Sequence, residues 1–118
     1  MKKLFIAFLL VSMSINLYAQ ENKVLTLNED TSLIEAKIYH DSGVIAQTGF
    51  YTTDGLLQGE WISYDAEGVK TAVANYNKGR KEGTWLFYTG DVLKEVTYKD
   101  SKILAVSTWN RDLGIMSN

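Results

Sequence analysis

Cysteine and proline are both absent from the 118-residue chain, and each absence excludes a class of structure or chemistry. Without cysteine the protein has no disulfide and no thiol nucleophile. Proline would remove a hydrogen-bond donor from an interior strand, so a chain without it is compatible with continuous sheet. Beyond the first nineteen residues the sequence has no helical periodicity. We therefore expect an all-β protein with an antiparallel meander of hairpins.

Residues suited to catalysis or metal binding are scarce. The single histidine, His40, precedes Asp41, and such a pair can act as base and orienting carboxylate, but both lie in a predicted turn without a nucleophile. A zinc site needs several His or Cys ligands, and no nucleotide-binding glycine motif is present. The candidate carboxylates lie mostly in predicted turns, where Asp suits the turn geometry and charges favour water: Asp54, Glu60, Asp65, Glu67, Glu82 and Asp91. We expect no enzymatic activity, no cofactor and no metal.

Basic residues are too few and too scattered for a polyanion. Without residues 1–19, which hold two lysines and no acid, the chain has ten basic and fourteen acidic residues, a net charge of −4. Nucleic acids and anionic membrane surfaces both require clustered Lys and Arg. The only cluster, Lys78, Arg80 and Lys81, is typical of a solvated turn. We expect neither nucleic acid nor membrane lipid as a partner.

The N-terminus has the pattern of a secretory signal peptide. Lys2 and Lys3 precede an apolar run at Leu4–Val11, and Ala19 is a small residue suited to cleavage. The run is shorter than the roughly 20 residues that a membrane-spanning helix needs. Export without disulfides is more typical of bacteria than of small eukaryotic secreted domains. We expect residues 1–19 to be removed, leaving a periplasmic or secreted bacterial protein that is not a lipoprotein and not inserted in the membrane.

The remaining chain divides into an arm, one domain and a tail. Residues 20–31 are polar and predict a flexible N-terminal arm, in which Val24, Leu25 and Leu27 could dock as a short strand. From Ser32 apolar and polar residues alternate with a period of two, which indicates a half-buried strand. We expect a β-repeat domain over residues 32–109 and a C-terminal tail over 110–118.

Four glycines mark hairpin turns at roughly twelve-residue spacing. Each stands at the fourth position of a turn, where a three-residue loop with a bulge needs positive φ: Gly43, Gly55, Gly68 and Gly79. The strands between turns are then 32–39, 44–52, 56–64, 69–76, 80–88, 93–98 and 103–109. These turns predict a meander in which sequence neighbours pair.

The segment 59–64, Gly-Glu-Trp-Ile-Ser-Tyr, returns as Gly-Thr-Trp-Leu-Phe-Tyr at 83–88, after about 24 residues, and Trp109 suggests a third copy. Gly59 and Gly83 lie inside strands, two residues before each Trp, where a glycine most often admits a neighbouring aromatic ring or backbone. We expect Trp61 opposite Ala72 or Val73, with the aromatic residues of successive copies stacked in register.

The repeated segment resembles the bacterial variant of the MORN repeat, with its pattern Gly-x-x-x-Gly-x-Trp-x-x-Tyr. The resemblance covers residues 39–109, with two clear copies and degraded ones at both ends. Ala36 stands at the position of the first tryptophan, and Ser101 replaces the last turn glycine. The matching residues are Asp54, Gly55, Gly59, Glu60, Trp61, Tyr64, Gly68, Tyr76, Lys78, Gly79, Glu82, Gly83, Thr84, Trp85 and Tyr88.

The resemblance implies a ribbon of hairpins that binds or scaffolds other proteins, with no catalytic residues. Some relatives are labelled antitoxin components, and eukaryotic relatives were linked to membranes. An exported protein is in the wrong compartment for a cytoplasmic antitoxin, and an acidic one lacks the charge for phospholipid head groups. An immunity-like role against a toxin stays a distant alternative.

The aromatic residues at repeat spacing are the candidate binding face: Trp61, Tyr64, Trp85, Tyr88 and Trp109. Such residues can form the core of the repeat, or line a groove for a protein segment or a sugar, because their rings are flat and apolar with polar tips. We expect an exported module that binds a protein partner through this face or by strand addition at an open edge. The alternative is a glycan or cell-wall binder. Equal exposure of the three tryptophans would favour a ligand face, and full burial a structural role.

Overall fold

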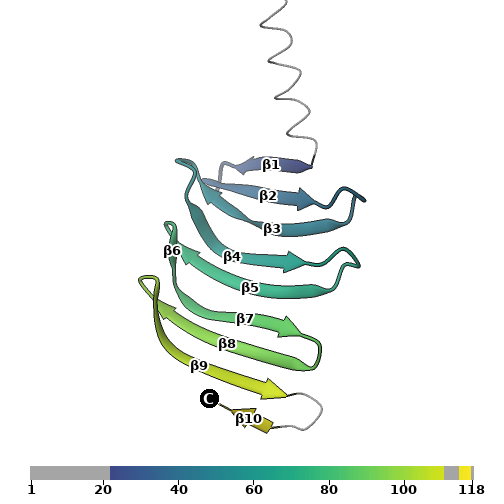
Figure 1. Ribbon diagram of the computed structural model, residues 1–118. Helices are drawn as coiled ribbons and strands as arrows, with labels where there is room; N and C mark the ends of the chain where they lie inside the picture. Colours follow the sequence, from purple (N-terminus) through teal and green to yellow (C-terminus); the bar gives the residue numbers. More distant parts are fainter. Residues whose placement is uncertain (1–21, 111–114, 118) are drawn as a thin grey trace, which may run out of the picture.

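The computed structural model describes residues 22–110 and, without their side chains, 115–117, and every regular element in them is a β-strand. The predicted signal peptide at 1–19 lies outside the described residues. One antiparallel sheet holds all the strands, stacked in chain order from β1 to β10 (Figure 1). The strands are β1 Lys23–Asn28, β2 Leu33–Tyr39, β3 Ile45–Thr52, β4 Leu57–Tyr64, β5 Lys70–Asn77, β6 Arg80–Lys81, β7 Gly83–Thr89, β8 Val92–Lys99, β9 Lys102–Asn110 and β10 Ile115–Ser117. The all-β antiparallel meander is confirmed.

Three of the four predicted glycine turns have the expected geometry. In each, the backbone N–H of the glycine donates to the residue three before it: Gly43 to His40, Gly55 to Thr52 and Gly68 to Asp65. All three glycines have φ between 84° and 93°. A side chain at these positions is penalised because the left-handed region brings Cβ close to the carbonyl oxygen. The three-residue loop with a bulge is therefore built as the sequence indicates.

The fourth turn is different, and the prediction for it was wrong. Asn77 pairs directly with Arg80, so Lys78 and Gly79 form a two-residue loop, with φ of 49° and 83°. Positive φ at both central residues is the mark of a type I′ turn, whose twist matches the strands it joins. Asp100 and Ser101 repeat this geometry without glycine, with φ of 50° and 66°. Ser101 thus replaces a turn glycine while keeping its positive φ, at the conformational cost that a side chain carries there.

The predicted arm and tail contribute strands to the two ends of the sheet. Residues 23–28 form β1, paired with β2 from Lys23 opposite Ile38 to Asn28 opposite Leu33. This is the docked strand that Val24, Leu25 and Leu27 suggested, and not a loose arm. At the other end β10 pairs with residues 108–110 of β9. The sheet thus extends beyond both limits of the predicted domain.

A single row of residues across the strands holds most of the core. Paired positions link Leu25 to Ala36 and Ala36 to Gly49 at one end, and Trp85 to Val96 and Val96 to Val106 at the other. Between them, Trp61 packs on Gly49 and pairs with Ala74. Of the five buried hydrophobic residues, four belong to this row: Ala36, Trp61, Trp85 and Val96. We call it the central row.

The register differs from the expectation that Trp61 faces Ala72 or Val73. Asp65 and Val69 close the loop, and a bulge between Ser63 and Tyr64 shifts the pairing by a further residue. Trp61 therefore stands opposite Ala74. The small residue still leaves room for the large one, as anticipated, but it is a different alanine. Ala36 does stand in the central row, at the tryptophan position of β2.

Candidate functional site

The sheet is a single layer, and its two faces differ in chemistry. Because side chains alternate along each strand, the central row and the residues two positions away from it share one face, which we call the aromatic face. The strand residues between them lie on the opposite face. The strands β4 and β7 supply the two indoles of the aromatic face, Trp61 and Trp85, which are 5% and 7% exposed.

Both indoles are held by the same set of contacts. Nε1–H of Trp61 donates to the carbonyl of Phe50 at 3.0 Å, and that of Trp85 to the carbonyl of Asn75 at 2.9 Å. A tyrosine follows each of these carbonyls and meets the indole edge-on. Tyr51 and Trp61 have ring centroids 5.0 Å apart at 74°. Edge-to-face geometry suits the ring quadrupoles and contributes about 0.5–1.5 kcal/mol beyond burial.

The second copy repeats and extends this arrangement. Tyr76 lies 5.1 Å from Trp85 at 66°, and Tyr98 adds a third ring at 5.0 Å. Burial, and in second place the neighbouring Tyr98, raise the pKa of the Tyr76 hydroxyl. The two copies therefore repeat the same contacts: each indole donates a hydrogen bond to a backbone carbonyl and packs against the tyrosine that follows that carbonyl.

Gly49 is the position that the sequence reading missed. A Cβ there would stand 2.0 Å from Cδ2 of Trp61, so any side chain would displace the ring. Gly59 and Gly83 are the positions expected to admit a neighbouring aromatic ring or backbone, but a Cβ at either finds its nearest atom at 3.9 Å, an ordinary contact. Those two glycines are required by backbone conformation instead, with φ of 69° and 68°. An isolated glycine inside the predicted strand 44–52 was the available signal.

Lysines stand over the aromatic rings. Nζ of Lys23 is 5.1 Å from the centroid of Tyr51, and Nζ of Lys81 is 5.1 Å from Trp85 and 5.2 Å from Tyr98. Lys94 adds a third ammonium on this face, since it precedes Val96 by two residues in β8. A cation over a ring face is attracted by the ring quadrupole, by about 0.5–1 kcal/mol at exposed sites.

Carboxylates within the described strands all project from the opposite face. Glu35, Glu60 and Glu95 each adjoin a residue of the central row along their strand, so their side chains alternate away from it. Glu35 there lies 3.7 Å from Lys37. The protein is acidic overall, yet the strand residues of its aromatic face include cations and no acid.

A groove of about 400 Å³ runs between the two indoles on the aromatic face. Its floor is formed by the alanines of β5, the strand between β4 and β7, and its walls are formed by aromatic rings. The lining residues are Gln47, Tyr51, Leu57, Trp61, Ser63, Ala72, Ala74, Tyr76, Trp85 and Phe87. The rings under Lys23 and Lys81, Tyr51 and Trp85, both belong to this lining. The groove is thus an apolar floor with an ammonium group near each of two walls.

The five predicted binding residues do not share one face, which corrects that expectation. Trp61 and Trp85 line the groove, whereas Tyr64 and Tyr88 follow them by three residues and therefore point to the opposite face. Trp109 pairs with Leu93, which pairs with Tyr88, so it also lies on the opposite face. Val106 occupies the position of a third tryptophan in the central row. The third repeat is degraded in its most important residue.

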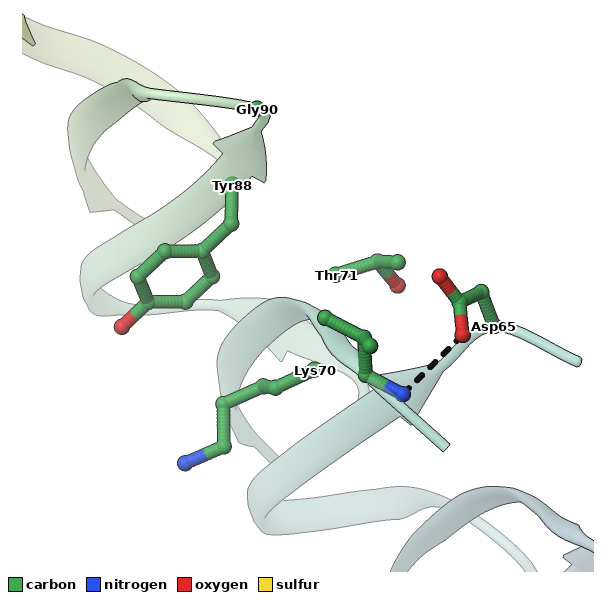
Figure 2. A pocket seen from close by; sticks show the side chains of 6 residues that line it. Asp65, Lys70, Thr71, Tyr88 and Gly90 are labelled. Atoms are coloured by element: carbon green, nitrogen blue, oxygen red, sulfur yellow. Dashed lines mark hydrogen bonds between the residues drawn. The ribbon is translucent and has the colours of Figure 1, made fainter. Parts of the chain in front are cut away.

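Tyr64 and Tyr88 line two separate hollows away from the groove. Figure 2 shows the hollow at Tyr88, with Lys70, Thr71 and the carboxylate of Asp65 around it. Asp65 Oδ1 accepts from the backbone N–H of Val69 at 3.0 Å and is therefore engaged in its own turn. Tyr64 lines a smaller apolar hollow with Val44, Ile45 and Gly68. Each hollow has a single aromatic residue in its lining, whereas the groove is lined by several aromatic rings.

The His40–Asp41 pair is separated into two structural roles. His40 is partly buried, and its Nε2 donates to the carbonyl of Tyr64 at 3.0 Å, since a carbonyl can only accept. Asp41 Oδ1 accepts from Nδ2 of Asn22 at 3.1 Å. His40 lies in the predicted turn between β2 and β3, and its ring joins this turn to the end of β4.

Among residues 22–110 no three His, Asp or Glu side chains come together as metal ligands would. Nor does this part of the chain contain a helix that could span a bilayer. In comparisons with known proteins, the chain matched no family model, no curated protein and no solved structure.

Proposed function

We propose that this protein is a non-enzymatic binding module that holds an extended, acidic segment of a protein partner in the groove of its aromatic face. The observation that carries the proposal is the division of charge between the two faces. The strands send Lys23, Lys81 and Lys94 to the face with the groove, and Glu35, Glu60 and Glu95 to the other. An acidic segment therefore meets cations and no carboxylate along the strands of the groove face, whereas the other face mixes carboxylates with lysines such as Lys37.

The shape of the groove supports an extended polypeptide. Its floor of Ala72 and Ala74 is shallow and apolar, and its rim offers the hydroxyl of Ser63 and the amide of Gln47, whose Nε2–H donates to Ser63 Oγ at 3.2 Å. Apolar side chains of a partner can settle between the rings while its carboxylates meet Lys23 and Lys81. Such a combination of an apolar core with a few polar groups is typical of ligand sites.

A glycan is the second candidate, and the geometry supports it less. Sugar rings stack on exposed, flat aromatic faces, but Trp61 and Trp85 are buried and their N–H groups are already bonded to backbone carbonyls. Glycan hydroxyls also seek carboxylates, which are absent from the strand residues of this face. Tyr51 and Tyr76 remain half-buried and would be the stacking residues of this alternative.

We further propose that the repeats are of the MORN type and that the mature chain acts in a bacterial periplasm or outside the cell. The recurring contacts of Trp61 and Trp85 support the repeat assignment, because the same residues that carry the resemblance make the same bonds twice. The pattern of residues 1–19 supports export. A scaffold or interaction module of the cell envelope is the role that combines the two.

The test is binding of three defined probes to the purified protein, measured by calorimetry. The probes are a ten-residue peptide alternating Asp and Leu, the same peptide with Lys for Asp, and a soluble peptidoglycan fragment. We expect the acidic peptide to bind at least about tenfold more tightly than the basic one, because two ammonium groups flank the groove. Preference for the glycan fragment, or equal affinity for both peptides, would reject the proposal.

Charge reversal locates the site. Lys23→Glu combined with Lys81→Glu is expected to weaken the acidic peptide about tenfold or more, since both changes act beside the groove. The control matched in charge is Lys37→Glu combined with Lys70→Glu, two strand lysines on the opposite face. Equal loss in the control would show a non-specific effect of net charge, and unchanged binding in the Lys23 and Lys81 variant would place the peptide elsewhere.

A further inference from the structure

We propose that a second copy of this chain extends the sheet head to tail, with β1 of one copy paired antiparallel to the open stretch of β9 of the other. The interface is the pair of sheet ends, which shares Lys23 of β1 with the flank of the groove but includes none of the residues that line the groove. Four properties of the two ends point to this occupant.

The first property is the length of free edge at each end. In the described part of the chain β10 pairs only with Thr108–Asn110, and β9 continues beyond it as Lys102–Ser107, six residues with no second neighbour. At the other end β1 is Lys23–Asn28, also six residues, and among residues 22–110 it pairs only with β2. Long apolar edges are unusual in natural sheets because their unpaired N–H and C=O groups template another strand.

The second property is apolar exposure concentrated in the strands at these ends, since the other exposed large hydrophobic residues, Leu56 and Val69, lie in turns. The central row is buried along the sheet but terminates in Leu25 at one end and Val106 at the other, 53% and 37% exposed. Flanking residues are exposed in the same way: Val24 48%, Leu27 53%, Ile103 60% and Leu104 63%. Joining the ends with Leu25 of one copy beside Val106 of the next aligns Val24–Asn28 with the open residues Ile103–Ser107, while Lys23 meets Thr108, where β10 already pairs. The central row then continues across the junction.

Strand direction is the third property. From β1 to β9, leaving out the short β6, the sheet contains eight strands that alternate in direction. An even number means that the strand which continues the alternation after β9 has the direction of β1. A second copy in the same orientation therefore presents β1 antiparallel to β9, with its aromatic face on the same side. No turning over of either copy is needed.

Charge is the fourth property, and it separates this pairing from a symmetric one. Lys99 and Lys102 are direct partners across β8 and β9, an unfavourable pair of like charges, while Asp100 between them is paired with Arg80. With Leu25 beside Val106, the antiparallel strand brings Glu29 and Asp30 of the incoming copy to these lysines. Two β9 edges paired with each other offer the lysines no acid.

The experiment uses two edge variants of the full chain and their mixture, observed by native mass spectrometry. Leu25→Lys blocks the β1 end and Val106→Lys blocks the β9 end, and both positions are exposed, so neither change empties the core. Val69→Lys, at a site 57% exposed in a turn, is the matched control. The two edge variants differ in mass, so a mixed dimer is recognised directly.

Head-to-tail addition predicts a concentration-dependent series of dimers, trimers and larger species for the wild type and for Val69→Lys. Each edge variant alone loses every species above the monomer, and their equimolar mixture forms mixed dimers and nothing larger, because only one good junction remains. A series that stops at dimers in the wild type overturns the proposal. So does an edge variant that still dimerises alone, which indicates symmetric pairing of like ends, or a wild type that stays monomeric.

Discussion

The middle of the sheet and its two ends are built from the same kind of strand, yet only the middle has a core. Between β3 and β8 the large residues Trp61 and Trp85 cover small neighbours such as Gly49 and Ala74, and the row becomes buried. At the ends the same row holds Leu25 and Val106, which have nothing to cover them. In this single-layer sheet the central row is buried where an indole covers it and exposed where no indole is present.

The largest effect expected from this contrast is the loss of a central tryptophan. Trp85→Ala removes a buried indole together with its bond to the Asn75 carbonyl and its contacts with Tyr76 and Tyr98, and should lower the free energy of unfolding by about 3–5 kcal/mol. Trp109→Ala, at 37% exposure near the end, should cost about 1 kcal/mol. Urea unfolding followed by far-ultraviolet circular dichroism measures both, and equal costs would contradict the contrast.

A medium effect is expected where a small residue makes room for a large one. Gly49→Ala forces Trp61 away from the Phe50 carbonyl and should cost about 1–3 kcal/mol. In a Trp61→Leu background the same change should cost less by about 1 kcal/mol or more, because the ring is gone.

Gly59→Ala supplies the comparison for that cycle. Its cost, about 1–2 kcal/mol, comes from a positive φ rather than from the ring, and should be the same in both backgrounds. Equal coupling of Gly49 and Gly59 to Trp61 would disprove the assignment of their separate roles.

The smallest effect on stability is expected for the exposed Trp109, whose replacement should instead change the accessibility of tryptophan fluorescence to a quencher. Trp109→Phe should change the free energy of unfolding by less than about 0.5 kcal/mol. It should nonetheless abolish most of the quenching of native fluorescence by acrylamide, because Trp61 and Trp85 are 5% and 7% exposed and Trp109 is 37% exposed. Stern–Volmer plots of both proteins give the answer. Strong quenching that survives in the variant would mean that the central indoles open to solvent.

The strands and three of the hairpins could be predicted because the determinants are local. Glycine at the fourth position determines the loop geometry at Gly43, Gly55 and Gly68. Asp65 adds to this by accepting hydrogen bonds from the N–H groups of Glu67 and Val69 within its own turn. The turn at Lys78–Gly79 also has glycine at the fourth position, but there a two-residue loop competes with the three-residue loop. The residues alone did not decide between them.

The candidate site was harder to predict because it depends on register, which accumulates over several strands. Register shifts occur between β2 and β3, β3 and β4, β4 and β5, and β8 and β9, and each shift changes which residues of neighbouring strands meet. The period of 24 residues made Trp109 look like a third copy, whereas pairing assigns that position to Val106. Lys23 and Lys81 are far apart in sequence and became part of one face only through the register.

The order of the strands has a consequence for how the protein folds. Along β1 to β9 every strand pairs with a neighbour in the chain, through loops of only two or three residues at most junctions. The entropy lost on closing such loops is small, so each hairpin can form early and without distant segments. Growth then proceeds outward from the tryptophan-bearing hairpins, one strand at a time. Hydrogen exchange should accordingly be slowest in β4, β5 and β7 and should quicken step by step toward β1 and β9.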